Sequence, residues 1–301
     1  MLRMAKLVCA GTLACLIAGT AIAQVEYTNN FKFNSGQSIQ PIFEGWSRSP
    51  DGGFNMHFGY LNRNYVEQPH VPVGVNNSVT PQGPDRGQPT FFYPRTSRNL
   101  FTVSVPKGWD LKREVVWTIT VNGKTEKAFG WLQPEWEIDP VGGASGGGNT
   151  SPERLKNKPP TISLDPVAPV KLPATATLIA AVADDGLPVQ RPRRKPAVGQ
   201  ETPPTLQGGT QAPVNVPQVA GVATPPGATP PAGQEPPQGL RVSWIVWRGP
   251  MAATFEPATT QAKDGKTTTT VTFRKPGEYV LKGTVTDTLL IASQQITVVV
   301  Q

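Results

Sequence analysis

Apolar and polar residues alternate with a period of two along several short stretches of the chain. The stretch from Phe54 to Tyr60 shows this alternation, and it recurs from Phe101 to Val105 and from Val115 to Val121. A period of two is typical of a β-strand with one buried face. No long window repeats the i, i+3, i+4, i+7 spacing of an amphipathic helix. The pattern therefore predicts an all-β protein.

The clearest local signal is a hairpin over residues 113–131, centred on Asn122-Gly123. This dipeptide favours a two-residue type I′ turn, because both central positions of that turn need a positive φ angle. The turn sets a register in which a large side chain meets a small one on one face, as close packing requires. The expected partners are Val121 and Lys124, Trp117 and Ala128, Val115 and Gly130, and Val116 and Phe129.

The second half of the chain also contains short strands separated by turn signals. These signals are Gly249-Pro250, Lys263-Asp264-Gly265 and Lys275-Pro276-Gly277. Several short strands at this spacing are typical of an antiparallel β-sandwich. The expected strands are Thr161–Leu164, Ala174–Ala183, Arg241–Arg248, Thr267–Phe273, Tyr279–Thr286 and Gln294–Val300.

The domain organisation begins with an export signal. A basic start and a short apolar run precede Ala21-Ile22-Ala23, which matches a signal-peptide cleavage site. Residues 1–23 are therefore predicted to be a signal peptide, and residues 24–138 an aromatic-rich β-sandwich domain. The Gly- and Ser-rich run within residues 139–158 cannot pack a core, so this segment is predicted to be a linker. A second sandwich domain is predicted at 159–301.

A Pro-rich segment, residues 189–239, interrupts the second domain. It contains repeated Pro-Pro pairs and few aromatic or branched residues. Such a segment cannot bury enough apolar surface to order itself, which predicts a disordered insertion. We expect the strands on its two sides to form one sandwich, because neither side alone supplies enough strands.

Several motifs lie around the strands of the second domain. They are Asp184-Asp185-Gly186-Leu187-Pro188, Trp244 shortly before Gly249-Pro250, the Phe-x-x-Pro-Gly-x-Tyr segment from Phe273 to Tyr279, and Val285-Thr286-Asp287. Together they resemble the polycystic-kidney-disease-type (PKD) immunoglobulin-like domain over roughly 159–188 and 241–301. The resemblance implies an immunoglobulin-like sandwich that serves extracellular adhesion, spacing or presentation of a neighbour, and no catalysis.

The first domain carries a different set of short segments. They are Gly45-Trp46, Gly59–Tyr65, Gly83–Pro89 and Gly130–Trp136. These segments resemble uncharacterised bacterial secreted proteins, and that resemblance implies no particular function.

Composition removes several classes of function. Both cysteines, Cys9 and Cys15, lie in the predicted signal peptide, so the mature chain is expected to lack disulfides, thiol nucleophiles and cysteine-ligated metals. Loss of Arg3 and Lys6 reduces the formal charge from +7 to 7 − 2 = +5. This excess is spread along the chain, whereas nucleic-acid binding favours a clustered basic face. No second apolar run is long enough to span a membrane. We expect no nucleic-acid partner and no transmembrane span.

Signals of catalysis are weak. The chain has only two histidines, His57 and His70, and it lacks the His-Glu-x-x-His motif. Glu135 and Glu137 flank Trp136, and on a strand their side chains would share a face about 7 Å apart. A glycosidase acid needs its own desolvated environment, which this arrangement does not supply. We therefore expect no enzyme and no cofactor.

The candidate binding surface is the outward side of the Phe54–Tyr60 strand and its continuation. Exposed aromatic residues on a sheet stack on sugars, and polar neighbours bind the hydroxyl groups. The alternative is that the aromatic residues of this domain fill its core. The candidate residues, assigned from alternation, are Asn55, His57, Arg63 and Tyr65.

Two charged clusters are further candidates. Asp184, Asp185 and Asp287 would converge at one end of the second sandwich, where oxygen-rich loop ends can hold Ca²⁺. Asp-Asp-Gly is also an ordinary turn, so no metal is assigned. The basic cluster would contact anionic envelope polymers, or it would be a solubilising patch in a disordered loop. It consists of Arg191, Arg193, Arg194 and Lys195.

The sequence therefore predicts two antiparallel, immunoglobulin-like β-sandwich domains joined by a Gly-rich linker. It favours an exported, non-enzymatic binding or structural protein in the periplasm, at the cell surface or outside the cell. The expected partner is a protein or a polysaccharide. The alternative is a carbohydrate-binding accessory module of a polymer-degrading system.

Overall fold

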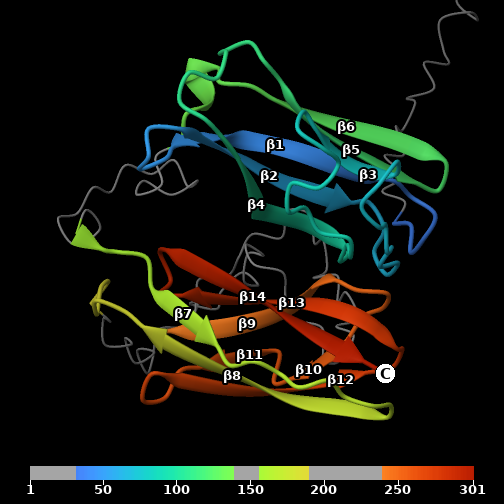
Figure 1. The fold of residues 1–301 in the computed structure, drawn as a ribbon, viewed down its shortest axis with the longest axis vertical. Helices are drawn as coiled ribbons and strands as arrows, with labels where there is room; N and C mark the ends of the chain where they lie inside the picture. Colours follow the sequence, from blue (N-terminus) through green and yellow to red (C-terminus); the bar gives the residue numbers. More distant parts are fainter. Residues whose placement is uncertain (1–31, 139–155, 190–238) are drawn as a thin grey trace, which may run out of the picture. The chain divides into compact units, whose positions relative to one another are not determined.

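The computed structural model describes residues 32–138, 156–189 and 239–301 (Figure 1). The predicted signal peptide, most of the predicted linker and most of the predicted insertion lie outside the described residues. The basic cluster at Arg191, Arg193, Arg194 and Lys195 lies outside them too. Within the described residues, no helix is long and apolar enough to cross a membrane.

The first group of strands forms two three-stranded sheets (Figure 1). One sheet has the order β1-β2-β4 and the other the order β3-β5-β6. A short 3-10 helix, η1 (Pro134–Trp136), follows the last strand. The strands are β1 (Ile39–Arg48), β2 (Phe54–Asn62), β3 (Asn77–Thr80), β4 (Arg95–Val105), β5 (Val115–Val121) and β6 (Lys124–Gly130).

The predicted hairpin is confirmed as β5-β6. Asn122 and Gly123 both have positive φ angles, of 52° and 72°, as the type I′ turn requires. All four expected residue pairs are partners in the observed register. On the buried face, the ring of Phe43 from β1 lies over Gly130, where an added Cβ atom would come within 2.7 Å of it. The small residue at the end of the hairpin is thus required by the facing sheet.

The second group of strands forms two four-stranded sheets (Figure 1). Their orders are β7-β8-β12-β10 and β11-β9-β13-β14. β8, which precedes the Pro-rich segment, pairs along its length with β12, which follows it. Strands from both sides of that segment therefore share one sheet. The strands are β7 (Thr161–Leu164), β8 (Ala174–Ala183), β9 (Arg241–Arg248), β10 (Thr254–Glu256), β11 (Thr259–Gln261), β12 (Lys266–Phe273), β13 (Gly277–Thr286) and β14 (Ile291–Val300).

These sheets confirm the predicted fold class, which is all-β with antiparallel sandwiches. Four strands were not predicted from the sequence: β1, β3, β10 and β11. The last three are four residues long or shorter, too short to show an alternating pattern. β1 contains a bulge between Phe43 and Gly45, where a register shift interrupts the alternation.

Each group of strands surrounds aromatic residues. Trp117 lies in the first core with its ring edge-on to Phe101 at a centroid distance of 4.8 Å. Trp244 is fully buried in the second core, together with Phe255 and Tyr279. These side chains supply the apolar area that stabilises a fold without disulfides.

Candidate functional site

β9 is buried on both of its faces. Val242, Trp244 and Val246 alternate toward the core of their own sandwich. Ile245 and Trp247 lie on the opposite face, which would meet solvent in an isolated sandwich, yet they are 3% and 1% exposed. The chain that covers Trp247 is the segment Asp85–Tyr93, which precedes β4. We call the contact between this segment and Val246–Arg248 the junction.

Backbone groups make the centre of the junction. The amides of Thr90 and Phe91 donate to the carbonyl oxygen of Trp247, at 3.0 and 3.4 Å. The indole Nε1 of Trp247 donates to the carbonyl oxygen of Gly87 at 3.2 Å. The Asp85–Tyr93 segment therefore provides hydrogen-bond partners for both the carbonyl oxygen and the indole nitrogen of Trp247, as a buried tryptophan requires.

Tyr93 provides a second contact to β9. Its hydroxyl oxygen accepts a hydrogen bond from the amide of Val246 at 2.9 Å. The backbone amide of Tyr93 in turn donates to the hydroxyl of Tyr60 on β2, at 2.8 Å. Burial raises the pKa of Tyr60 to about 12 and raises the pKa of Tyr93 as well. Both phenols therefore stay protonated at any physiological pH.

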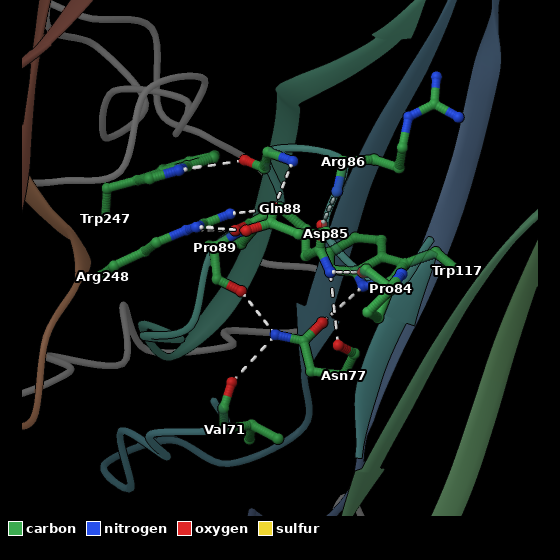
Figure 2. A network of polar contacts seen from close by, with 11 residues as sticks. Val71, Asn77, Pro84, Asp85, Arg86, Gln88, Pro89, Trp117, Trp247 and Arg248 are labelled. Atoms are coloured by element: carbon green, nitrogen blue, oxygen red, sulfur yellow. Dashed lines mark hydrogen bonds and ion pairs between the residues drawn. The ribbon is translucent and has the colours of Figure 1, made fainter. Parts of the chain in front are cut away.

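Arg248 and Asp85 form a forked ion pair at the edge of the junction (Figure 2). The two terminal nitrogens of Arg248 lie 2.9 and 2.7 Å from the two carboxylate oxygens. Its Nε donates to the carbonyl oxygen of Gln88 at 3.0 Å. The hydrogen bonds from Arg248 lower the pKa of Asp85. Asp85 is half-exposed, so solvent weakens the electrostatic attraction of this pair. The pair acts mainly by fixing the orientation of Arg248 through two parallel hydrogen bonds.

Side chains from the first group of strands hold the Asp85–Tyr93 segment in place (Figure 2). The Nδ2 of Asn77 donates to the carbonyl oxygens of Val71 and Pro89, at 3.0 and 2.8 Å. Its Oδ1 accepts from the indole of Trp117 at 3.0 Å. Asn77 is fully buried. Trp117 of the β5-β6 hairpin therefore positions Asn77, and Asn77 holds the segment that covers Trp247.

Lys282 on β13 completes the junction. Its ammonium group lies 2.7 Å from the carbonyl oxygen of Leu100 and 4.3 Å from the centre of the Trp247 ring. A cation over an indole face is stabilised by the ring quadrupole. Burial nevertheless lowers the pKa of Lys282 to about 8. Burial beside the junction therefore disfavours the charged form of this lysine.

The four residues of the expected binding surface fall into two groups. Asn55 and His57 lie on the outward face of β2, where Asn55 accepts from the hydroxyl of Ser104 and His57 contacts the hydroxyl of Ser47 at 2.8 Å. Arg63 and Tyr65 follow the end of β2. Arg63 pairs with Glu126, and Tyr65 lies beneath the guanidinium of Arg95.

His57 is half-buried, and desolvation lowers its pKa. Its hydrogen-bonding partners are hydroxyl groups of the neighbouring strands β1 and β4. His70 lies in a loop, makes an isolated bridge with Phe91, and has a pKa lowered by burial and by Lys275.

The setting of Glu135 and Glu137 differs from the strand expected from the sequence. Both belong to the turn around η1, because Pro134 begins a helical turn and lacks an amide hydrogen for a sheet. Glu137 is the last residue of this turn and pairs with Arg48 at 2.8 Å. Trp136 between them is 40% exposed, with its ring stacked between Phe43 and Trp131.

The three expected aspartates lie at loop ends of the second sandwich. Asp184 and Asp185 follow β8, and Asp287 follows β13. Asp184 and Asp287 both line a cavity of about 670 Å³. Desolvation raises the pKa of Asp184, and the nearby charges of Asp287 and Asp185 raise it further. The described residues contain no group of three or more His, Cys, Asp or Glu side chains arranged to hold a metal ion by themselves.

The junction residues were not found from the sequence. One signal was present: Ile245-Val246-Trp247 is an unbroken apolar run, which is typical of a strand buried on both faces. The covering segment Asp85–Tyr93 carries no comparable signal, because its backbone groups rather than its side chains make most of the contacts.

Comparison with known proteins identifies no family for the chain. No protein-family model and no curated protein matches the chain. Among solved structures, the I-band fragment I67-I69 from titin matches with 10% sequence identity and a TM-score of 0.23, over 87% of this chain and 64% of that chain. The chimeric titin tandem Z1Z2-Z1Z2 matches with 9% identity and a TM-score of 0.22, over 88% of this chain and 97% of that chain. The chain spans less than two thirds of the I67-I69 fragment. The antiparallel pairing of its strands is described by the chain's own sheet orders.

Proposed function

We propose that the protein is an exported, non-enzymatic binding or structural protein that works in the cell envelope or outside the cell. Its partner would be a protein or a polysaccharide. The second sandwich would be a PKD-type immunoglobulin-like domain, as its motifs around Asp184-Asp185-Gly186 and Phe273–Tyr279 suggest. Export is supported by the signal-like first 23 residues of the sequence.

The observation that carries the proposal is the junction. The described residues from Phe33 onward belong to one compact unit, and Trp247 is buried at the contact between its two sandwiches. Contacts between domains in one chain are commonly small and mobile. Here backbone hydrogen bonds, a buried tryptophan and a forked ion pair fix the contact. Such a pair of sandwiches can present one rigid surface to a partner, which favours binding by reducing the entropy lost on association.

The test is binding by the mature chain. We expect either a reproducible, saturable protein partner by crosslinking and pull-down, or a defined signal on a glycan array. The Trp247→Ala variant, which loosens the junction, should bind the same partner at least several-fold more weakly. Absence of both protein and glycan binding by the folded chain would contradict the proposal. Equal binding by the variant would show that a rigid junction is not required.

One observation favours the alternative, a carbohydrate-binding accessory module. Phe43, Trp136 and Trp131 form a stack with centroid distances of 5.2 and 5.6 Å, and Trp136 is 40% exposed. Partly exposed tryptophans with polar neighbours bind sugar rings. A glycan signal that Trp131→Ala removes would support this function. Phe129→Ala, which alters an exposed aromatic residue on β6, is the matched control.

A further inference from the structure

β14 is an edge strand of its sheet, and most of its outer edge is open. Only its last residues are covered. The amide of Val170 donates to the carbonyl oxygen of Val299 at 3.0 Å, and the amide of Gln301 donates to the carbonyl oxygen of Val170 at 2.8 Å. None of the residues from 291 to 297 is buried. We call the stretch 291–297 the open edge.

The bonds to Val170 show which backbone groups of β14 face outward. They use residues 299 and 301, and in an antiparallel strand the hydrogen-bonding direction alternates with each residue. Even-numbered residues therefore bond to β13, and odd-numbered residues point away from it. In the open edge, the outward amides and carbonyls belong to Ile291, Ser293, Gln295 and Thr297. Among the described residues, no hydrogen bond reaches these backbone groups.

Every other sheet edge in the described part of the chain has a feature that discourages pairing with another strand. Short strands, prolines, bulges and exposed charged residues all have this effect. The strands β3, β7, β10 and β11 are four residues long or shorter. β1 contains Pro41 and a register shift, β4 contains a register shift and two arginines, and β6 exposes Lys124 and Lys127. β14 has ten residues, IASQQITVVV, with no charge, no proline and no register shift.

We propose that the protein forms a two-fold symmetric dimer in which the open edge pairs antiparallel with the open edge of a second copy. A second copy is the occupant because, within the described ranges, β14 is the one edge that lacks protection. The matching open edge on another molecule is therefore β14 again. A contact between identical surfaces closes as a dimer and does not continue into a fibre. It would join the β11-β9-β13-β14 sheets of the two copies into one continuous sheet.

The open edge is complementary to itself. In an antiparallel pair, outward-pointing residues must face outward-pointing residues, so odd-numbered positions face odd-numbered positions. With the two-fold axis at Gln294, Ile291 faces Thr297 and Ser293 faces Gln295 of the other copy. The first pair joins two β-branched side chains, and the second joins two uncharged polar ones. Because the open edge has no charged residue, the symmetry brings no like charges together.

The dimer goes beyond the proposed function, because that function concerns a partner other than the chain itself. Failure of the dimer would leave the proposed binding function untouched. In the single chain the outward backbone groups bond to water, so pairing exchanges hydrogen bonds and its net gain is modest. A ladder along the open edge also buries less surface than the roughly 1,200–2,000 Å² of a standard interface. We therefore expect a reversible dimer whose population depends on protein concentration.

Sedimentation equilibrium of the mature chain over a wide concentration range tests the dimer, and amide hydrogen exchange locates it. In dilute solution the amides of Ser293 and Gln295 should exchange fast, whereas those of Gln294 and Ile296, bonded to β13, should be protected. At high concentration all four amides should be protected. A chain that stays monomeric throughout, or a dimer without new protection at Ser293 and Gln295, would overturn the proposal.

Two double variants test the register. Ser293→Glu with Gln295→Glu places carboxylates opposite carboxylates, and it should weaken dimerisation by about tenfold or more. Ser293→Lys with Gln295→Glu places each lysine opposite a carboxylate, and it should keep a dimer that weakens as salt is added. Lys282 lies opposite Gln295 in the β13-β14 ladder. Both variants contain Gln295→Glu, so its effect on Lys282 is the same in the two.

The matched control is Lys124→Gln with Lys127→Gln on the protected edge of β6. It lowers the net charge by the same amount as the double glutamate variant and should leave dimerisation unchanged. The unfolding temperature in dilute solution shows that each variant folds as a monomer. Dimerisation that survives Ser293→Glu with Gln295→Glu would place the contact on another surface and overturn the proposal. Equal loss in both double variants would overturn the register, and with it the proposed pairing.

Discussion

The hydroxyl group of Tyr93 accepts a hydrogen bond from the backbone amide of Val246, a residue 153 positions later in the chain. The amide belongs to β9, and the tyrosine belongs to the segment that precedes β4. Both atoms are buried. This single bond joins the backbone of one sandwich to a side chain anchored in the other, and it sits beside Trp247.

Tyr93→Phe should therefore destabilise the protein without altering either core. The change leaves the Val246 amide buried without an acceptor, which costs about 1–3 kcal/mol in the free energy of unfolding. Urea denaturation followed by tryptophan fluorescence measures this loss. A loss below about 0.5 kcal/mol would mean that water reaches the amide and replaces the hydroxyl.

Trp247→Ala should separate the unfolding of the two sandwiches. The substitution removes a fully buried indole and its bond to Gly87, which typically costs about 3–5 kcal/mol. We expect a single calorimetric transition in the original chain and two in the variant, because each sandwich keeps its own core. Trp136→Ala removes an indole that is 40% exposed and should preserve the single transition. A variant with one unchanged transition would contradict the importance of the junction.

Lys282 should make the stability rise at alkaline pH. Its pKa falls from 10.5 in the unfolded chain to about 8 in the folded protein. Between these values the unfolded state binds more protons, so the free energy of unfolding increases with pH. The full gain is about 3 kcal/mol, since one pKa unit corresponds to about 1.4 kcal/mol. Below pH 8 the lysine is charged in both states, and its contribution stays constant.

Denaturation at several pH values between 7 and about 9.5 follows this effect, starting below the folded-state pKa of Lys282. Lys282→Met should remove the rise, whereas Lys124→Met, at an exposed position of β6, should keep it. The range ends below pH 10 because Tyr60 and Tyr93 act in the opposite direction there: burial raises their pKa above the unfolded value of 10.0, so the unfolded state loses these protons first. An unchanged rise in Lys282→Met would assign the effect to another group.

Gly130→Ala should overpack the first core. The added methyl group would approach the Phe43 ring to 2.7 Å, and the Phe58 ring to 3.1 Å. Overpacking of this kind costs typically about 1–3 kcal/mol. Phe43→Leu makes room, so the double variant should recover part of the loss. Simple additivity of the two single changes in a double-mutant cycle would contradict this contact.

Local patterns accounted for most of the strands. The alternation in Phe54–Tyr60 corresponds to β2, and Asn122-Gly123 placed the β5-β6 turn in the correct register. Alternation and turn chemistry act between neighbouring residues, so they can be read from the sequence. The short strands β10 and β11 escaped detection because pairing with β12 and β9, not their own pattern, makes them strands.

The sequence by itself determined the all-β class and the hairpin register, because these depend on the period of side chains and on local turns. Only the tertiary structure decided that the outer face of β9 is covered, that Lys282 lies over Trp247, and that Asn157 meets Asp287. Each of these contacts joins residues far apart in the chain. No local pattern encodes them, since they depend on how distant segments of the chain pack together once the sheets have formed.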